Sequence, residues 1–110
     1  MSFRMVDIPD TFKVDVRVRI PGVKSQKTLQ AEFNMISDEE IEELNGLPAE
    51  QQDEKFVKDV LVGLHGVRDE SDEKVDPDVA KTLMKYPFVR KPVTTAFFKA
   101  MSGSDPRLGN

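Results

Sequence analysis

The chain has 110 residues, of which 38% are hydrophobic and 33% are charged, and its formal net charge is −4. This composition supplies one domain with a modest core, and the acidic balance argues against a nucleic-acid partner. There is no cysteine, which excludes disulfides, thiolate nucleophiles and zinc–thiolate sites. The first ten residues lack the apolar stretch of a signal peptide, and no run is long enough to cross a bilayer. We therefore expect a cytoplasmic protein.

Charge is unevenly distributed along the chain. Residues 1–36 include 6 basic and 4 acidic side chains. Residues 37–76 include 4 basic and 14 acidic side chains, and residues 77–110 include 6 basic and 2 acidic ones. The simple interpretation is that helix faces and a loop are solvated by their own carboxylates. The alternative is attraction between the acidic middle and the basic end of neighbouring copies, or of a partner, which predicts a salt-sensitive association.

Residues 11–35 have the pattern of an antiparallel β-hairpin. Hydrophobic side chains occupy every second position over 12–20 and again over 29–35, with Pro21 and Gly22 between the two runs. Two strands are not stable alone in water, so their shared apolar face must be covered by the rest of the chain.

Four helices are predicted after the hairpin, over residues 38–45, 48–65, 77–86 and 88–102. Ser37 and Glu40 have the spacing of a capping box, and Asp76 precedes Pro77 as an N-cap pair. Hydrophobic residues recur at helical spacing within the segments. The prediction is a single α+β domain over residues 1–102, with an N-terminal antiparallel hairpin packed against about four α-helices, followed by a flexible tail over 103–110.

The stretch "GLHGVRDESDEKVDPD" contains the only histidine, His65, followed by several carboxylates. Its position in the last turn of the predicted helix 48–65 favours a capping or surface role. The carboxylates lack a second histidine and do not match a calcium loop, and Ser71 lacks the strand-to-helix elbow of an activated nucleophile. We interpret the stretch as a connector, and we predict no catalytic residue, no metal site and no cofactor. The carboxylates considered are Asp69, Glu70, Asp72, Glu73 and Asp76.

Four apolar residues near the C-terminus are candidates for partner binding. Phe98 follows Phe97 directly, and adjacent helical positions point about 100° apart, so both cannot face the centre of one core. Tyr86 and Phe88 flank Pro87, where the chain turns, and Met101 lies about one turn after Phe98. Tyr86, Phe88, Phe98 and Met101 therefore form a candidate patch for a client or for self-association, unless a small core closes over all of them.

The order "FVKDVLVGLHGVRDESDEKVDPDVAKTLMKYPFVRKPVTTAFFKAMSG", with "RLGN" at the end, resembles the small tail assembly chaperones of long-tailed bacteriophages and prophages. In that family a "GV-(R/K)-D" turn precedes an acidic connector, a helix with a leucine pair, and a last helix leading to a tail that ends in Asn. The resemblance covers residues 56–110. Here "VGLHG" lacks the tryptophan often found near the turn, and Leu83-Met84 replaces the leucine pair.

The resemblance implies a non-enzymatic role in the cytoplasm of the host bacterium. Proteins of this family bind the tape measure protein, keep its hydrophobic helices from aggregating, help to recruit tail tube subunits, and are absent from the mature virion.

Two other roles remain open from the residues. The edges of the hairpin could accept another strand, as in a strand-pairing adaptor or a structural tail subunit. A weak nucleic-acid contact through Lys13, Arg17 and Arg19 is disfavoured, because that face has no aromatic residues on which bases could stack.

Overall fold

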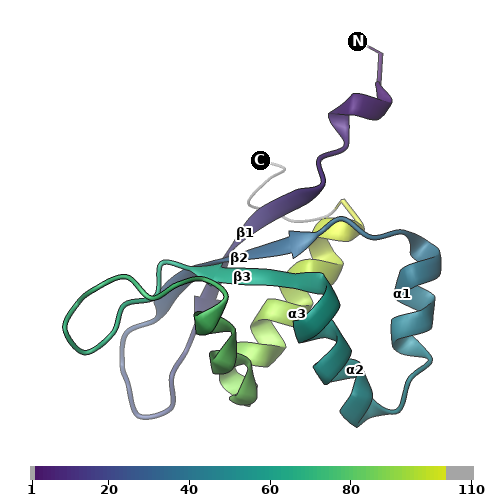
Figure 1. Ribbon diagram of the computed structural model, residues 1–110. Coiled ribbons are helices and arrows are strands. Elements are labelled where there is room, and N and C mark those ends of the chain that lie inside the picture. The colour runs from purple at the N-terminus through teal and green to yellow at the C-terminus, as the bar shows by residue number, and fades with distance from the viewer. Residues whose placement is uncertain (1, 104–110) are drawn as a thin grey trace.

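A three-stranded antiparallel sheet lies over a layer of helices (Figure 1). The computed structural model describes residues 2–103, and the sheet has the order β1-β2-β3, with β1 at Thr11–Val18, β2 at Lys27–Asn34 and β3 at Leu61–His65. The helical segments are η1 (Met5–Asp7), α1 (Asp38–Asn45), α2 (Ala49–Lys55), η2 (Phe56–Val60), η3 (Val79–Lys85) and α3 (Pro87–Met101). With α2 and η2 counted as one helix and the single turn η1 set aside, this is the predicted α+β fold with four helices. Of the predicted tail, 104–110 lie outside the described residues.

The hairpin prediction is confirmed by the pairing of β1 with β2. Phe12 pairs with Phe33, Val14 with Ala31 and Val16 with Leu29, so alternate residues of both strands point to the same face. The valines of β1 are buried on that face, whereas its charged residues are exposed on the other. The helices cover only the apolar face, as the alternating pattern requires.

The predicted helix over 48–65 is wrong in its second half. The helix α2 ends at Lys55, the wider turn η2 follows, and residues Leu61–His65 form the third strand. β3 pairs antiparallel with β2, with a bulge opposite Glu32 and Phe33, and Asn34 Nδ2 donates a 2.9 Å hydrogen bond to the carbonyl of Asp59 where the chain enters the strand. His65 therefore lies at the end of a strand and does not cap a helix.

The outer side of β3 is covered by the segment around Pro77. The Leu64 N–H donates to the Pro77 carbonyl over 3.0 Å. A Cβ atom at Gly63 would lie 2.7 Å from Pro77 Cβ, so only glycine permits this approach.

The remaining helix predictions hold with adjusted boundaries. Ser37 caps α1 in the predicted capping box, with Glu40 N–H donating to Ser37 Oγ over 3.3 Å. The segment predicted as a helix over 77–86 is the 3₁₀-helix η3, which begins at Val79. Asp76 Oδ1 instead accepts a 2.8 Å hydrogen bond from the Asp78 N–H and holds the turn that precedes it. α3 begins at Pro87, where a missing N–H costs no helical hydrogen bond.

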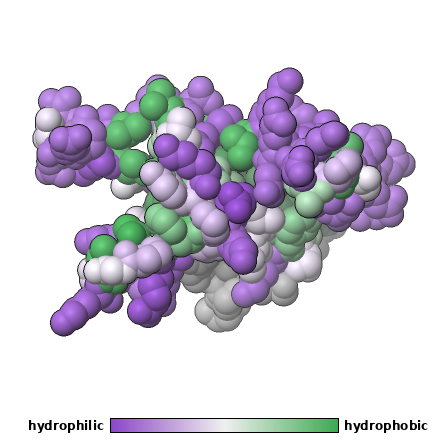
Figure 2. Space-filling model, turned by 90° about the horizontal axis from the view of Figure 1, so that it is seen from below, coloured by the Kyte–Doolittle hydropathy of each residue, from purple (hydrophilic) through white to green (hydrophobic). Residues whose placement is uncertain are grey.

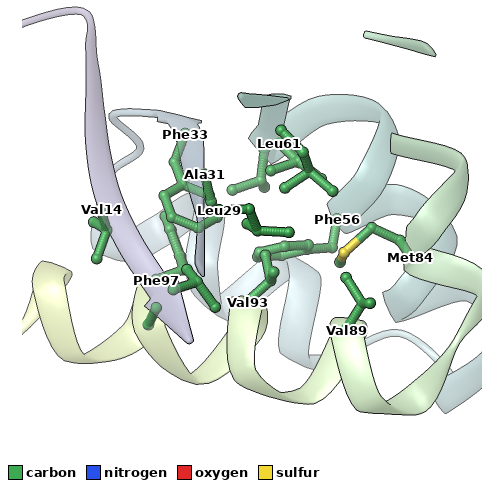
Figure 3. Packing of buried hydrophobic residues seen from close by; sticks show 14 of the residues in the cluster. Val14, Leu29, Ala31, Phe33, Phe56, Leu61, Met84, Val89, Val93 and Phe97 are labelled. Atoms are coloured by element: carbon green, nitrogen blue, oxygen red, sulfur yellow. The ribbon is translucent and has the colours of Figure 1, made fainter. Parts of the chain in front are cut away.

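The core is centred on aromatic rings from three elements. Phe33 of β2, Phe56 of η2 and Phe97 of α3 contact one another, with ring centroids 5.1–6.0 Å apart. Figure 3 shows these rings between the sheet and α3, with Val93, Val89 and Met84 continuing the cluster along the helix. The non-local contact of β2, η2 and α3 ties the strands to the helical layer.

Candidate functional site

An apolar groove lies at the end of the sheet where β1 finishes and β2 begins. Its volume is about 750 Å³, within the range of sites that hold ligands or peptide side chains. Its walls come from four segments of the chain: the β1–β2 hairpin, the loop after β3, the end of η3 and the start of α3. The principal apolar lining residues are Ile20, Leu29, Val67, Leu83, Tyr86 and Phe88.

The groove is open and its apolar walls are partly exposed. Ile20, Val67, Leu83 and Phe88 are half-buried, and Tyr86 has 41% of its surface exposed. Figure 2 shows hydrophobic residues (green) toward the left of the view, where two protruding parts of the molecule frame a hollow. Contiguous apolar surface of this kind marks interaction sites in soluble proteins.

Two of the four predicted partner-binding residues line this groove. The rings of Tyr86 and Phe88 stack with centroids 5.2 Å apart, and Lys85 Nζ lies 5.2 Å from the centre of the Tyr86 ring. Pro87 between them starts α3, which places both rings at the same end of the helix. A rigid aromatic pair with an exposed edge is well suited to contact another polypeptide.

Phe98 and Met101 lie at the other end of α3, roughly 15 and 20 Å from Phe88 along the helix axis. Both are half-buried and pack against the core. Phe98 makes an edge contact with Phe97 at 5.1 Å and lines a small cavity of about 40 Å³ beside Leu44. The structure therefore does not bring the four predicted residues into one patch.

The sequence reasoning missed half of the groove. Ile20, Val67 and Leu83 line it but are distant in sequence from the aromatic pair. It also missed an exposed apolar segment before β1, which contains Phe3, Met5, Val6 and Ile8. A search for hydrophobic residues outside any helical or alternating pattern would have found that segment.

His65 takes part in a polar cluster on the sheet face opposite the core. Its Nε2 lies 2.8 Å from Glu32 Oε1, and Thr11 Oγ1 donates a 2.8 Å hydrogen bond to Glu32 Oε2. These contacts with His65 and Thr11 lower the pKa of Glu32. A carboxylate with a lowered pKa is a weak base, so the arrangement favours a brace across all three strands over acid/base chemistry.

The acidic connector forms a short loop closed by an isolated bridge between Arg68 and Lys74. Asp69 Oδ1 accepts hydrogen bonds from the Ser71 and Glu73 N–H groups, at 2.9 and 3.0 Å. Carboxylates used in this way shape the loop itself. Among residues 2–103, no three His, Asp or Glu side chains form a group that could hold a metal ion.

The acidic middle and the basic end of the sequence meet within one chain. Arg90 Nε of α3, in the basic end, lies 3.4 Å from Asp53 Oδ2 of α2, in the acidic middle. A partly exposed pair like this contributes little to stability, but it shows that part of the charge asymmetry is used inside the fold.

Comparisons with known protein families, curated proteins and solved structures found no match to this chain. Within the described part of the chain, no helix is long and apolar enough to span a membrane.

Proposed function

We propose that this protein is a tail assembly chaperone of a long-tailed bacteriophage or prophage. In this role it binds the tape measure protein and helps to recruit tail tube subunits in the cytoplasm of the host bacterium. It acts without catalysis or a cofactor and is absent from the mature virion. The sequence resemblance over residues 56–110 points to the family, and the apolar groove supplies a surface for the client.

The groove is the observation that carries this proposal. Tape measure proteins, as the resemblance implies, offer long helices whose apolar stripes lack partners before the tail tube forms around them. An amphipathic helix binds by laying such a stripe into an apolar groove. Tyr86 and Phe88 provide rigid aromatic contacts, while Leu83 and Val67 add aliphatic surface.

The alternative is a strand-pairing adaptor or a structural tail subunit. It is favoured by the free side of β1, since β1 pairs only with β2 in the described chain. An unpaired strand edge accepts a strand from another chain, although charged residues such as Lys13 and Arg17 on β1 oppose indiscriminate pairing.

Co-expression with a tape measure protein from the same phage or prophage tests the proposal. Wild-type protein is expected to keep the tape measure protein in the soluble fraction and to co-purify with it. Tyr86→Asp places a charge on the exposed aromatic wall and is expected to reduce the co-purified amount by about tenfold.

Val79→Asp is the matched control, because Val79 is another large hydrophobic residue, 59% exposed, that lies outside the groove. This variant is expected to behave as wild type. Equal losses for both variants, or no co-purification of the wild type, would refute the groove as the client site. Presence of the protein in finished particles would favour the structural subunit instead.

A further inference from the structure

The chain has a second unusual apolar surface, the arm formed by residues 2–10 before β1. Its large hydrophobic side chains are strongly exposed: Phe3 78%, Met5 89%, Val6 83% and Ile8 51%. Single exposed hydrophobic residues are ordinary, but four within six positions form a patch that no other segment of residues 2–103 covers.

The arm is not an irregular thread. The turn η1 is closed by hydrogen bonds from the Asp7 N–H to the Arg4 carbonyl and from the Arg4 N–H to Asp7 Oδ2, at 2.9 and 2.8 Å. The Met35 N–H donates to the Asp10 carbonyl over 2.9 Å, which anchors the arm where it joins the sheet. This local structure lowers the entropy that the arm would lose on binding.

The arm and the groove lie at opposite ends of β1. The arm precedes Thr11, whereas the groove includes Val18 and Ile20 at the far end of the strand. Eight residues of strand separate them by roughly 25 Å. In Figure 1 the arm extends beyond the sheet, away from the loops at the other end. A chain in this conformation cannot fill its own groove, but it presents an arm to another copy.

The charges at the two surfaces are compatible with this contact. Residues 16–31, which form the hairpin tip beside the groove, include four basic side chains and no acidic one. One of them, Lys27, lines the groove and is exposed, and the exposed Arg68 lines it from the loop after β3. The arm carries carboxylates at Asp7 and Asp10, on either side of Ile8, and its basic Arg4 lies nearer the tip. Opposite charges of this kind set the orientation of a contact more than its strength.

We propose that the arm of one copy binds in the groove of a second copy, with Phe3 and its apolar neighbours against Leu83, Tyr86 and Phe88. The contact joins two different surfaces, so after one contact one copy keeps a free groove and the other a free arm. Self-association therefore competes with any other occupant of the groove. This inference does not depend on the proposed function, because it concerns the protein alone.

Tyr86 makes a site-specific test available. It is the only tyrosine, and the chain has no tryptophan, so intrinsic fluorescence above 300 nm reports the groove. A synthetic peptide of residues 2–10 contains neither residue and is silent. Titrated into the full-length Phe3→Asp variant, this peptide is expected to change the Tyr86 emission in a saturable way, and the same peptide with Phe3→Asp is expected to bind about tenfold more weakly.

Sedimentation velocity over a concentration series measures the association itself. Wild type is expected to self-associate, Phe3→Asp and Tyr86→Asp are each expected to weaken this by about tenfold or more, and Val79→Asp is the unchanged control. The two defective variants, when mixed, are expected to form a pair, because one retains an intact groove and the other an intact arm. Far-UV circular dichroism establishes that each variant is folded.

Three results would overturn the proposal. The first is a wild-type protein that stays monomeric up to about 1 mM. The second is a mixture of folded Phe3→Asp and Tyr86→Asp variants that does not pair. The third is a concentration-independent change of Tyr86 emission caused by Phe3→Asp, which would place the arm in the groove of its own chain. A wild-type protein that self-associates in this way but does not bind the tape measure protein would instead count against the proposed function alone.

Discussion

Replacing Gly63 by alanine would place a methyl group where Pro77 already lies. The added Cβ would lie 2.7 Å from Pro77 Cβ and 3.1 Å from both the carbonyl carbon and oxygen of Pro77. Because two of these atoms belong to the backbone, the segment must move away from β3 and weaken the 3.0 Å hydrogen bond from the Leu64 N–H. Overpacking costs about 1–3 kcal/mol and the hydrogen bond about 1 kcal/mol more, so we expect a loss of about 2–4 kcal/mol.

Urea unfolding followed by far-UV circular dichroism measures this loss as a lower transition midpoint with an unchanged slope. A loss of that size is a large part of the free energy of unfolding of an ordinary domain, which is about 5–15 kcal/mol. Gly46→Ala is the matched control, because Gly46 has φ −79° and an added Cβ would lie no closer than 3.4 Å to the Glu42 carbonyl oxygen. The control is expected to be neutral or stabilising by up to about 1 kcal/mol. If Gly63→Ala were as stable as Gly46→Ala, the close approach of Pro77 would not exist in solution.

Two further predictions concern polar contacts. Ser37→Ala removes the acceptor for the Glu40 N–H and is expected to lower the free energy of unfolding by about 1 kcal/mol. Amide exchange is expected to be faster at the start of α1 and unchanged in α3. Equal exchange at the start of α1 in wild type and Ser37→Ala would contradict the cap. Glu32→Gln tests the pH dependence of stability. Contacts with His65 and Thr11 lower the pKa of Glu32 in the folded state. The contribution of Glu32 to the free energy of unfolding is therefore present above the ordinary glutamate pKa, and it is lost as the pH falls through the lowered pKa. The unfolding free energy of wild type is therefore expected to fall more steeply with acidification below about pH 5 than that of Glu32→Gln, and parallel curves would refute the brace.

Several elements were predictable because their signals are local. Alternation along β1 assigns its valines to one face, since any other arrangement would expose them or bury charges. The capping box at Ser37 and the proline at the start of α3 specify helix ends through backbone groups only a few residues away. These features require no knowledge of where the rest of the chain lies.

The third strand was not predictable in this way. In residues 56–65, Phe56, Val60, Leu61 and Leu64 have helical spacing and are all buried, yet the chain changes from helix to strand after Val60. Short apolar runs fit both structures, and the decision depends on β2, which offers an unpaired edge. The β-branched Val62 beside Gly63 is the local signal that favours a strand.

Only the aromatic part of the groove was predictable, because its other wall depends on segments that are distant in sequence. Tyr86 and Phe88 stood out as apolar residues at a turn, but Val67 and Leu83 join them only because β3 positions the loop after it next to η3. Phe98 and Met101 looked equivalent to the aromatic pair in sequence, and the length of α3 separates them from it.

The sequence by itself determined the class of the domain, the two faces of the hairpin and the principal helix ends, because those follow from side-chain periodicity and from backbone groups that neighbouring residues satisfy. Tertiary structure alone decided that residues 61–65 complete the sheet, that Pro77 presses against Gly63, and that four distant segments enclose a groove far from the exposed arm. These features arise from hydrogen-bond edges and apolar surfaces that only segments distant in sequence can satisfy.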